Sequence, residues 1–136
     1  MENKAEFNNC IAEAERPKQI MEDFVPFEIA KKLKEKGFRG KVNACYGKHE
    51  NIFDVHPALD MNDCDYRASA PTISQALKWL REEKNMMVFP AYSKNTSKWY
   101  CFIINADSLE SYNLSLDDSY EDAALSGIEY ALNNLV

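Results

Sequence analysis

The sequence predicts a single α+β domain, with a small, mainly antiparallel sheet and about three helices packed on it. Residues 71–136 supply the main observation, because they follow the order of a capped helix, a β-hairpin and a second capped helix. The second observation is length, since 136 residues suit one domain with a core of its own. We place this domain at residues 24–136 and expect residues 1–23 to form an N-terminal arm or a short helix.

The first predicted helix of the domain spans residues 26–36. Ile29 and Leu33 lie four residues apart, which places them on one helical face, and Gly37 is suited to end the helix. The opposite face is basic and could contact phosphates, or it could simply be solvated beside neighbouring glutamates. Its basic residues are Lys31, Lys32, Lys34 and Lys36.

Two short strands are predicted next, at residues 42–46 and 52–55, around a turn at residues 47–51. Residues 57–70 are polar and are predicted to form an ordered loop. No repeat, low-complexity tract or linker separates this half of the chain from the next.

The second helix, predicted at residues 72–84, begins with a capping box. Thr72 and Gln75 have the spacing at which a hydroxyl and an amide each satisfy an unpaired backbone N–H. Apolar residues then recur at helical spacing, which predicts one buried face. These residues are Ile73, Ala76, Leu77 and Leu80.

A β-hairpin follows, with strands at residues 86–92 and 99–105 joined by a polar connection. Pro90 has no N–H to donate, so we expect the first strand to lie at a sheet edge. Aromatic and β-branched residues on both faces of the second strand indicate a central position. A weaker third strand is predicted at residues 109–114.

The last predicted helix spans residues 119–135. Ser119 with Asp122, or the pair one position earlier, can form its N-terminal cap. Gly127 lies inside this helix, where Gly costs up to about 1 kcal/mol relative to Ala. We interpret this glycine as a point of close packing against the sheet rather than as a hinge.

The net charge of −6 is concentrated at the C-terminal end of the chain. No Lys or Arg follows Lys98. The acids there either favour the start of the last helix through its dipole or form an acidic surface for a basic partner. Direct nucleic-acid binding is disfavoured, since it normally requires a basic patch. The acids after Lys98 are Asp107, Glu110, Asp117, Asp118, Glu121, Asp122 and Glu129.

Four side chains in the first half are of types that suit zinc, although their spacing lacks the close pairs of structural zinc sites. The same segment offers Cys–His pairs, but nothing in the sequence orients a nucleophile, and phosphate-binding and nucleophile-elbow motifs are missing. The sequence therefore predicts no cofactor and favours a non-enzymatic protein. The candidate ligands are Cys45, His49, His56 and Cys64.

The chain has more large aromatic residues than one small core readily hides. Trp and Tyr are favoured at the centres of protein interfaces, whereas the alternative is packing on the sheet. Self-association is a further expectation, because it would cover open sheet edges. The interaction candidates combine aromatic and acidic residues: Trp79, Tyr92, Trp99, Asp117, Asp118, Glu121 and Asp122.

The sequence indicates a cytoplasmic protein with no membrane partner. No apolar run approaches the ~20 residues of a membrane span. The charged N-terminal residues lack the apolar region of a signal peptide. The four cysteines are dispersed, which suits free thiols in a reducing compartment.

Several segments resemble a set of small uncharacterised proteins of phages, prophages and mobile elements from anaerobic gut bacteria. The segments are residues 27–38 (FEIAKKLKEKGF), 70–82 (APTISQALKWLRE), 120–124 (YEDAA) and 130–132 (YAL). These motifs are helix faces and caps, so the resemblance implies a fold and a phage or mobile-element context in a bacterial host, and no catalytic residues.

The leading hypothesis is therefore a non-enzymatic protein-binding accessory factor of a phage or mobile element. One alternative is a small metal-binding protein or enzyme that uses the Cys45–Cys64 segment. The other is a nucleic-acid-associated protein that binds through the Lys31–Lys36 helix.

Overall fold

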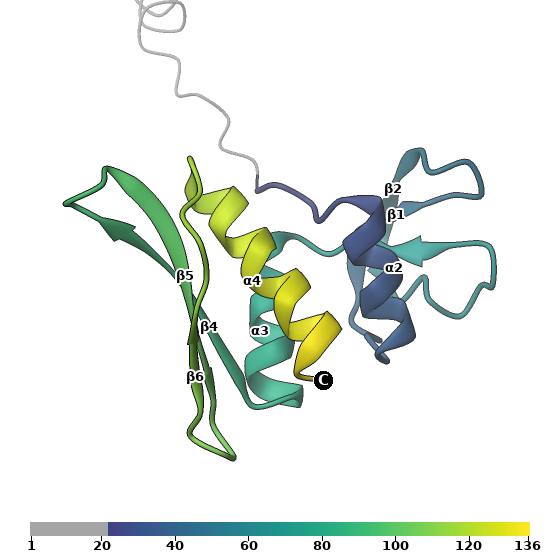
Figure 1. Cartoon of the computed structure of the whole chain (residues 1–136). Helices are drawn as coiled ribbons and strands as arrows, with labels where there is room; N and C mark the ends of the chain where they lie inside the picture. The colour runs from purple at the N-terminus through teal and green to yellow at the C-terminus, as the bar shows by residue number, and fades with distance from the viewer. Residues whose placement is uncertain (1–21) are drawn as a thin grey trace, which may run out of the picture.

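The computed structural model describes residues 22–136, which fold into two small sheets on either side of a helical layer (Figure 1). The predicted N-terminal arm, residues 1–23, lies almost wholly outside the described residues. The predicted α+β class is confirmed. None of the helices formed by residues 22–136 has the length and apolar character needed to cross a bilayer.

The three described helices lie where the sequence predicts them. They are α2 (Phe27–Glu35), α3 (Ile73–Glu83) and α4 (Tyr120–Asn134). The capping box of α3 is complete, since the Thr72 hydroxyl accepts from the Gln75 backbone and the Gln75 side chain accepts from the Thr72 backbone. At the start of α4, the Ser119 hydroxyl accepts from the Asp122 N–H at 3.0 Å. Local cap chemistry therefore sets these helix starts.

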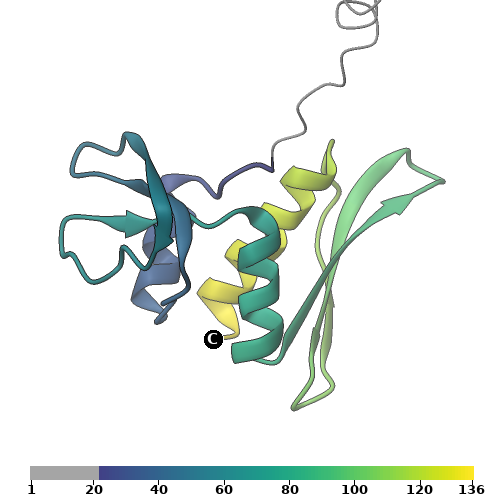
Figure 2. The same cartoon turned by 180° about the vertical axis from the view of Figure 1, so that it is seen from behind.

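The strands divide between two antiparallel three-stranded sheets rather than gathering in one. The first sheet has the order β2-β1-β3, with β1 (Val42–Tyr46), β2 (Ile52–Leu59) and β3 (Ala68–Ser69). The second has the order β4-β5-β6, with β4 (Met86–Ser93), β5 (Lys98–Asn105) and β6 (Ser111–Asn113). Helices α3 and α4 lie between the sheets in both views, which keeps the sheets from joining (Figures 1 and 2).

The second sheet confirms the predicted strand positions. Strand β4, which carries Pro90, lies at an edge, and β5 is central between β4 and β6. The first sheet departs more from the prediction. Strand β2 is longer than expected, and β3 forms within the predicted 57–70 loop, where Ser69 is fully buried.

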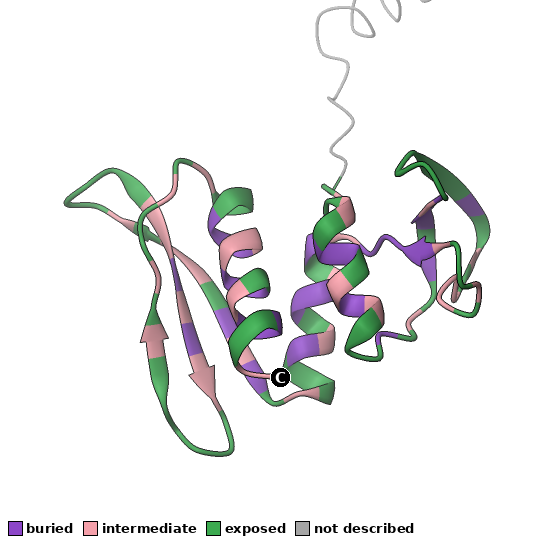
Figure 3. Ribbon diagram, turned by 45° about the vertical axis from the view of Figure 1, so that its right-hand side comes forward, coloured by how far each residue is buried: buried purple, intermediate pink, exposed green. Residues whose placement is uncertain are grey.

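The core is one cluster that runs from α2 and β1 through α3 and α4 to β4 and β5, and the buried stripes of the helices are visible in Figure 3. Gly127 is buried where α4 meets β4 and β5. A Cβ at this position would lie 2.2 Å from Cys101 Sγ and 2.8 Å from Val88 Cγ1, well inside ordinary contact distance. The predicted close packing of α4 on the sheet is therefore confirmed.

Helices α3 and α4 cover only one face of the second sheet (Figures 1 and 2). We call the opposite face the outer face. Side chains alternate along a strand, and Val88 and Ile103 are paired and buried toward the helices, so their neighbours point to the outer face. The apolar residues of the outer face are Met87, Phe89, Ala91, Tyr100, Phe102 and Ile104.

Candidate functional site

Three aromatic side chains meet where the β4–β5 hairpin passes the start of α4, and we call them the aromatic cluster. The rings of Tyr92 and Trp99 have centroids 5.3 Å apart, and those of Trp99 and Tyr120 are 5.6 Å apart in an edge-to-face arrangement. Tyr92 is 53% exposed and Tyr120 is 39% exposed. The cluster is thus a set of mutually supported rings with two of its members open to solvent.

The backbone fixes the position of the aromatic cluster. Tyr92 and Trp99 are directly opposite each other in the β4–β5 ladder, on the face that looks toward the helices. Trp99 and Asp117 then exchange two backbone hydrogen bonds, of 2.9 and 2.7 Å, which tie β5 to the segment that leads into α4. Ser119 caps α4 directly afterward, so Tyr120 enters the helix beside Trp99.

Acidic side chains lie beside the aromatic cluster. Asp118 forms an ion pair with Lys98, which is the last basic residue of the chain. The hydrogen bond and charge of Lys98 lower the pKa of the Asp118 carboxyl, and those of Asp118 raise the pKa of Lys98. Glu121 and Asp122 are exposed in the first turn of α4, where carboxylates complement the helix dipole.

Asp117 occupies a different environment from its acidic neighbours. Its Oδ2 atom is buried and has no hydrogen-bond partner among the described residues. Burial and the nearby Asp117 carboxylate together raise the pKa of the Cys101 thiol to about 11. Asp117, Asp122 and Glu129 also border a small open cavity of about 250 Å³ between α4 and α2. The acidic surface therefore continues from the cluster along α4.

Six of the seven predicted interaction residues are thus brought together at this end of the molecule. Trp79 is the exception. Its ring is partly buried against the core, where it packs against Phe38 at 5.7 Å and under the Lys84 ammonium at 5.3 Å. It borders a separate cavity of about 310 Å³. Trp79 therefore lies on α3, apart from the surface that the other six candidates form.

The predicted zinc ligands are not assembled into a site. Cys45 is buried in β1, where its sulfur accepts a hydrogen bond from Arg67 at 3.5 Å. His49 lies in the turn after β1, His56 lies in β2 and Cys64 lies in the following loop. Within residues 22–136, no group of three or more His, Cys, Asp or Glu side chains is arranged to hold a metal ion. The side-chain types suit zinc, but the fold does not bring them together.

Three of the four candidate phosphate-binding lysines, in and just after α2, already have partners within the chain. Lys32 pairs with Glu129 at 3.3 Å, and Lys36 donates to the Val136 carbonyl at 2.8 Å. Lys34 donates to loop carbonyls, at 2.5 Å to Cys64 and 2.6 Å to Arg67. These contacts attach α2 to α4 and to the loop before β3, so their role is structural.

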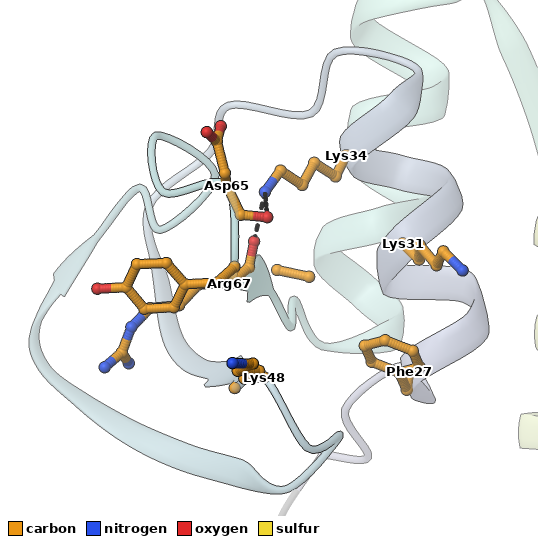
Figure 4. Close-up of a pocket in the computed structure, with 9 residues that line it drawn as sticks. Phe27, Lys31, Lys34, Lys48, Asp65 and Arg67 are labelled. Carbon is orange, nitrogen blue, oxygen red and sulfur yellow. Dashed lines mark hydrogen bonds between the residues drawn. The ribbon is translucent and has the colours of Figure 1, made fainter.

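A cavity of about 250 Å³ lies between α2 and this loop (Figure 4). Basic residues border it, but Figure 4 shows that Lys34 points to loop carbonyls and that Lys31 points away from the hollow. The Arg67 guanidinium instead packs over the rings of Phe53 and Tyr66, at 5.8 and 5.6 Å. Three of the basic side chains around the cavity are therefore directed elsewhere, and its walls are largely apolar.

Sequence reasoning missed two features of the surface. Tyr120 belongs to the aromatic cluster, and the position directly after the Ser119 cap was a usable signal for this. The outer face is the other feature. Its apolar residues alternate with buried ones in β4 and β5, and the elements of residues 22–136 cover only one side of this sheet.

Comparison of the chain with protein-family models, with curated proteins and with solved structures found no match.

Proposed function

We propose that this chain is a non-enzymatic protein-binding accessory factor of a phage or mobile element, acting in the cytoplasm of a bacterial host. In this proposal the aromatic cluster and its neighbouring acids bind a basic segment of another protein. The observation that carries the proposal is the pair of exposed tyrosines that pack edge-to-face with Trp99, beside Asp118, Glu121 and Asp122. The resemblance of the helix motifs to phage and mobile-element proteins supports the context.

The chemistry of the cluster suits a Lys- or Arg-bearing partner. Tyr and Trp rings provide large apolar contact area, and their faces attract Lys and Arg cations. Carboxylates next to the rings add charge attraction, which increases the association rate most at low salt. Lys98 is already paired with Asp118, and no Lys or Arg follows it in the chain, so the later residues add no further cation to repel the partner's.

The proposal is tested by capture of partners from bacterial lysate on the tagged full chain, with and without nuclease, followed by quantitative mass spectrometry. We expect a stoichiometric protein partner that survives nuclease and is lost with Tyr92→Ser combined with Tyr120→Ser. The matched control is Tyr66→Ser, since Tyr66 is 62% exposed and lies in the loop before β3. Loss of the partner after nuclease, or equal loss with the control, would contradict the proposal.

A further inference from the structure

The cavity between α2 and the loop before β3, which we call the α2 cavity, has the size and walls of a small-molecule site (Figure 4). Its volume is about 250 Å³, just below the range of about 300–1,000 Å³ that is typical of sites for drug-sized ligands. Gly47 and Ala68 are small, buried residues of its wall, so they leave this space open. Phe27 and Tyr66 add aromatic surface. The α2 cavity therefore suits a ligand with a small apolar body.

Four basic side chains line the α2 cavity, and they differ in what they contact. They are Lys31, Lys34, Lys48 and Arg67. Lys34 donates to loop carbonyls, whereas Lys31 and Arg67 pack over aromatic rings. The Lys48 ammonium has neither an ion-pair nor a hydrogen-bond partner among the residues that the structure describes. Lys48 is therefore the cation that is left for a ligand.

The groups that line the α2 cavity carry an excess of positive charge. None of its four cations forms an ion pair within residues 22–136, although the whole chain has 22 acidic residues and 16 Lys or Arg residues. Among the described residues, Asp65 is the one acid on the cavity wall, and Figure 4 shows its carboxylate pointing away from Phe27 and Lys48. Walls of low dielectric concentrate the potential of such charges in a cleft. The charges therefore favour an anion over a neutral or cationic ligand.

We propose that the α2 cavity binds a small aromatic carboxylate, with the ring of the ligand against the apolar wall and its carboxylate at Lys48. An ammonium and a carboxylate form a charge-assisted hydrogen bond, and aromatic rings pack favourably against one another. Phosphate is usually held by several donors at once, such as an Arg fork, but the Arg67 guanidinium packs over Phe53 and Tyr66. One free ammonium beside apolar walls therefore fits a monoanion with a ring better than it fits a phosphate.

The α2 cavity is separate from the aromatic cluster. The cavity lies at the first sheet, whereas Tyr92 and Trp99 of the cluster belong to the second sheet (Figure 1). The carboxylate site therefore does not depend on the function proposed above. Lys48→Met should leave capture of a protein partner by the aromatic cluster unchanged, so the two proposals can fail independently.

The test is a titration of the ¹⁵N-labelled full chain with sodium benzoate at constant ionic strength, followed by the chemical shifts of the backbone amides. We expect saturable shifts centred on Gly47, Lys48 and Ala68, with a dissociation constant of about 1 mM, because a ligand with one ring and one charge has few atoms to contribute. Benzyl alcohol has the ring without the charge, and inorganic phosphate has charge without the ring. Each should bind at least about tenfold more weakly than benzoate. Higher salt should also weaken benzoate binding, because Lys48 is exposed.

Two variants assign the binding to the α2 cavity. Lys48→Met removes the free ammonium and should raise the dissociation constant for benzoate about tenfold. The matched control is Lys94→Met, because Lys94 is an exposed turn residue between β4 and β5, and it should leave the constant unchanged. Ala68→Val adds bulk to the cavity wall and should abolish the saturable shifts while Lys48 is still present. If the amide spectrum shows that Ala68→Val does not fold, the exposed Lys48→Met variant still decides the test.

Four results would overturn the carboxylate site. The first is the lack of saturable shifts up to about 20 mM benzoate, well above the expected dissociation constant. The second is equal binding of benzyl alcohol, which would remove the role of the charge. The third is tighter binding of phosphate than of benzoate, which would assign the cavity to a different anion. The fourth is an equal effect of Lys48→Met and Lys94→Met, which would show general attraction to the net charge rather than a site.

Discussion

Replacement of Gly127 by Ala tests how tightly α4 packs on the second sheet. The added Cβ would lie 2.2 Å from Cys101 Sγ and 2.8 Å from Val88 Cγ1, whereas ordinary contacts begin at 3.4 Å. Helix α4 contacts both β4 and β5, so it cannot move away from one contact without disturbing the rest of the core. The substitution therefore sets steric overlap against helix propensity.

The steric overlap is larger than the gain in helix propensity, so we can predict the sign of the change in the free energy of unfolding. Overpacking of a core costs about 1–3 kcal/mol, and an overlap of this size belongs at the upper end. The change from Gly to Ala inside a helix stabilises the helix by up to about 1 kcal/mol. We expect Gly127→Ala to lower the free energy of unfolding by about 2 kcal/mol, measured by urea denaturation followed by circular dichroism.

The Cys101→Ala background provides the matched control. Removal of Sγ eliminates the shortest contact and leaves the contact with Val88 at 2.8 Å. Gly127→Ala should therefore cost about 1 kcal/mol less in this background than in the wild-type chain, which is a coupling typical of residues in direct contact. A Gly127→Ala variant that is more stable than wild type, as helix propensity alone predicts, would refute the close packing.

Three further predictions concern the cap, a thiol and a structural lysine. Thr72→Ala removes the N-cap of α3 and should lower the free energy of unfolding by about 1 kcal/mol in urea denaturation. Because the pKa of Cys101 is raised from 9.0 to about 11, its contribution to stability is present below pH 9.0 and is lost as pH rises toward 11. Wild type should then lose about 2 kcal/mol more than Cys101→Ala between pH 9 and pH 11, and equal losses would contradict burial of the thiol. Lys34→Met removes hydrogen bonds to loop carbonyls and should cost about 1–3 kcal/mol by the same urea assay, whereas Lys31→Met should stay within about 0.5 kcal/mol of wild type.

The features that sequence predicted well are governed by neighbours along the chain. The capping box at Thr72 and the Ser119 cap depend on residues three positions apart. The edge position of β4 follows from the missing N–H of Pro90, and the close approach at Gly127 follows from the lack of a side chain. Each of these features has a local physical cause, so the sequence pattern alone was sufficient to predict it.

The features that sequence did not predict depend on contacts between distant residues. Strand β3 has only 2 residues, and Ser69 is held there because its N–H donates to the Asn62 side chain and its hydroxyl accepts from Met61. The division into two sheets depends on α3 and α4 packing between them. Helical spacing showed which faces of these helices are apolar, but it could not show which sheet each face would cover.

The sequence identified most residues of the candidate site, but it showed only in part which of them lie together in the fold. The acids after Lys98 and the hairpin aromatics were visible as separate signals, and the Trp99–Asp117 backbone pairing is what joins them. The same reasoning grouped four zinc-type side chains that lie close in sequence, yet Cys45 is fully buried in β1 and the others lie on separate elements. Proximity along the chain does not establish that side chains converge.

The most direct test of the account is the fluorescence of Trp99 during titration with a partner captured from lysate. The chain has 2 tryptophans, so Trp79→Phe leaves Trp99 as the single reporter within the aromatic cluster, and Trp99→Phe leaves Trp79 as the control. We predict a saturable change in Trp99 emission that weakens as salt is raised, and no change in Trp79 emission. Binding that leaves Trp99 emission unchanged, or that alters only Trp79, would contradict the assignment of the aromatic cluster as the protein-binding site.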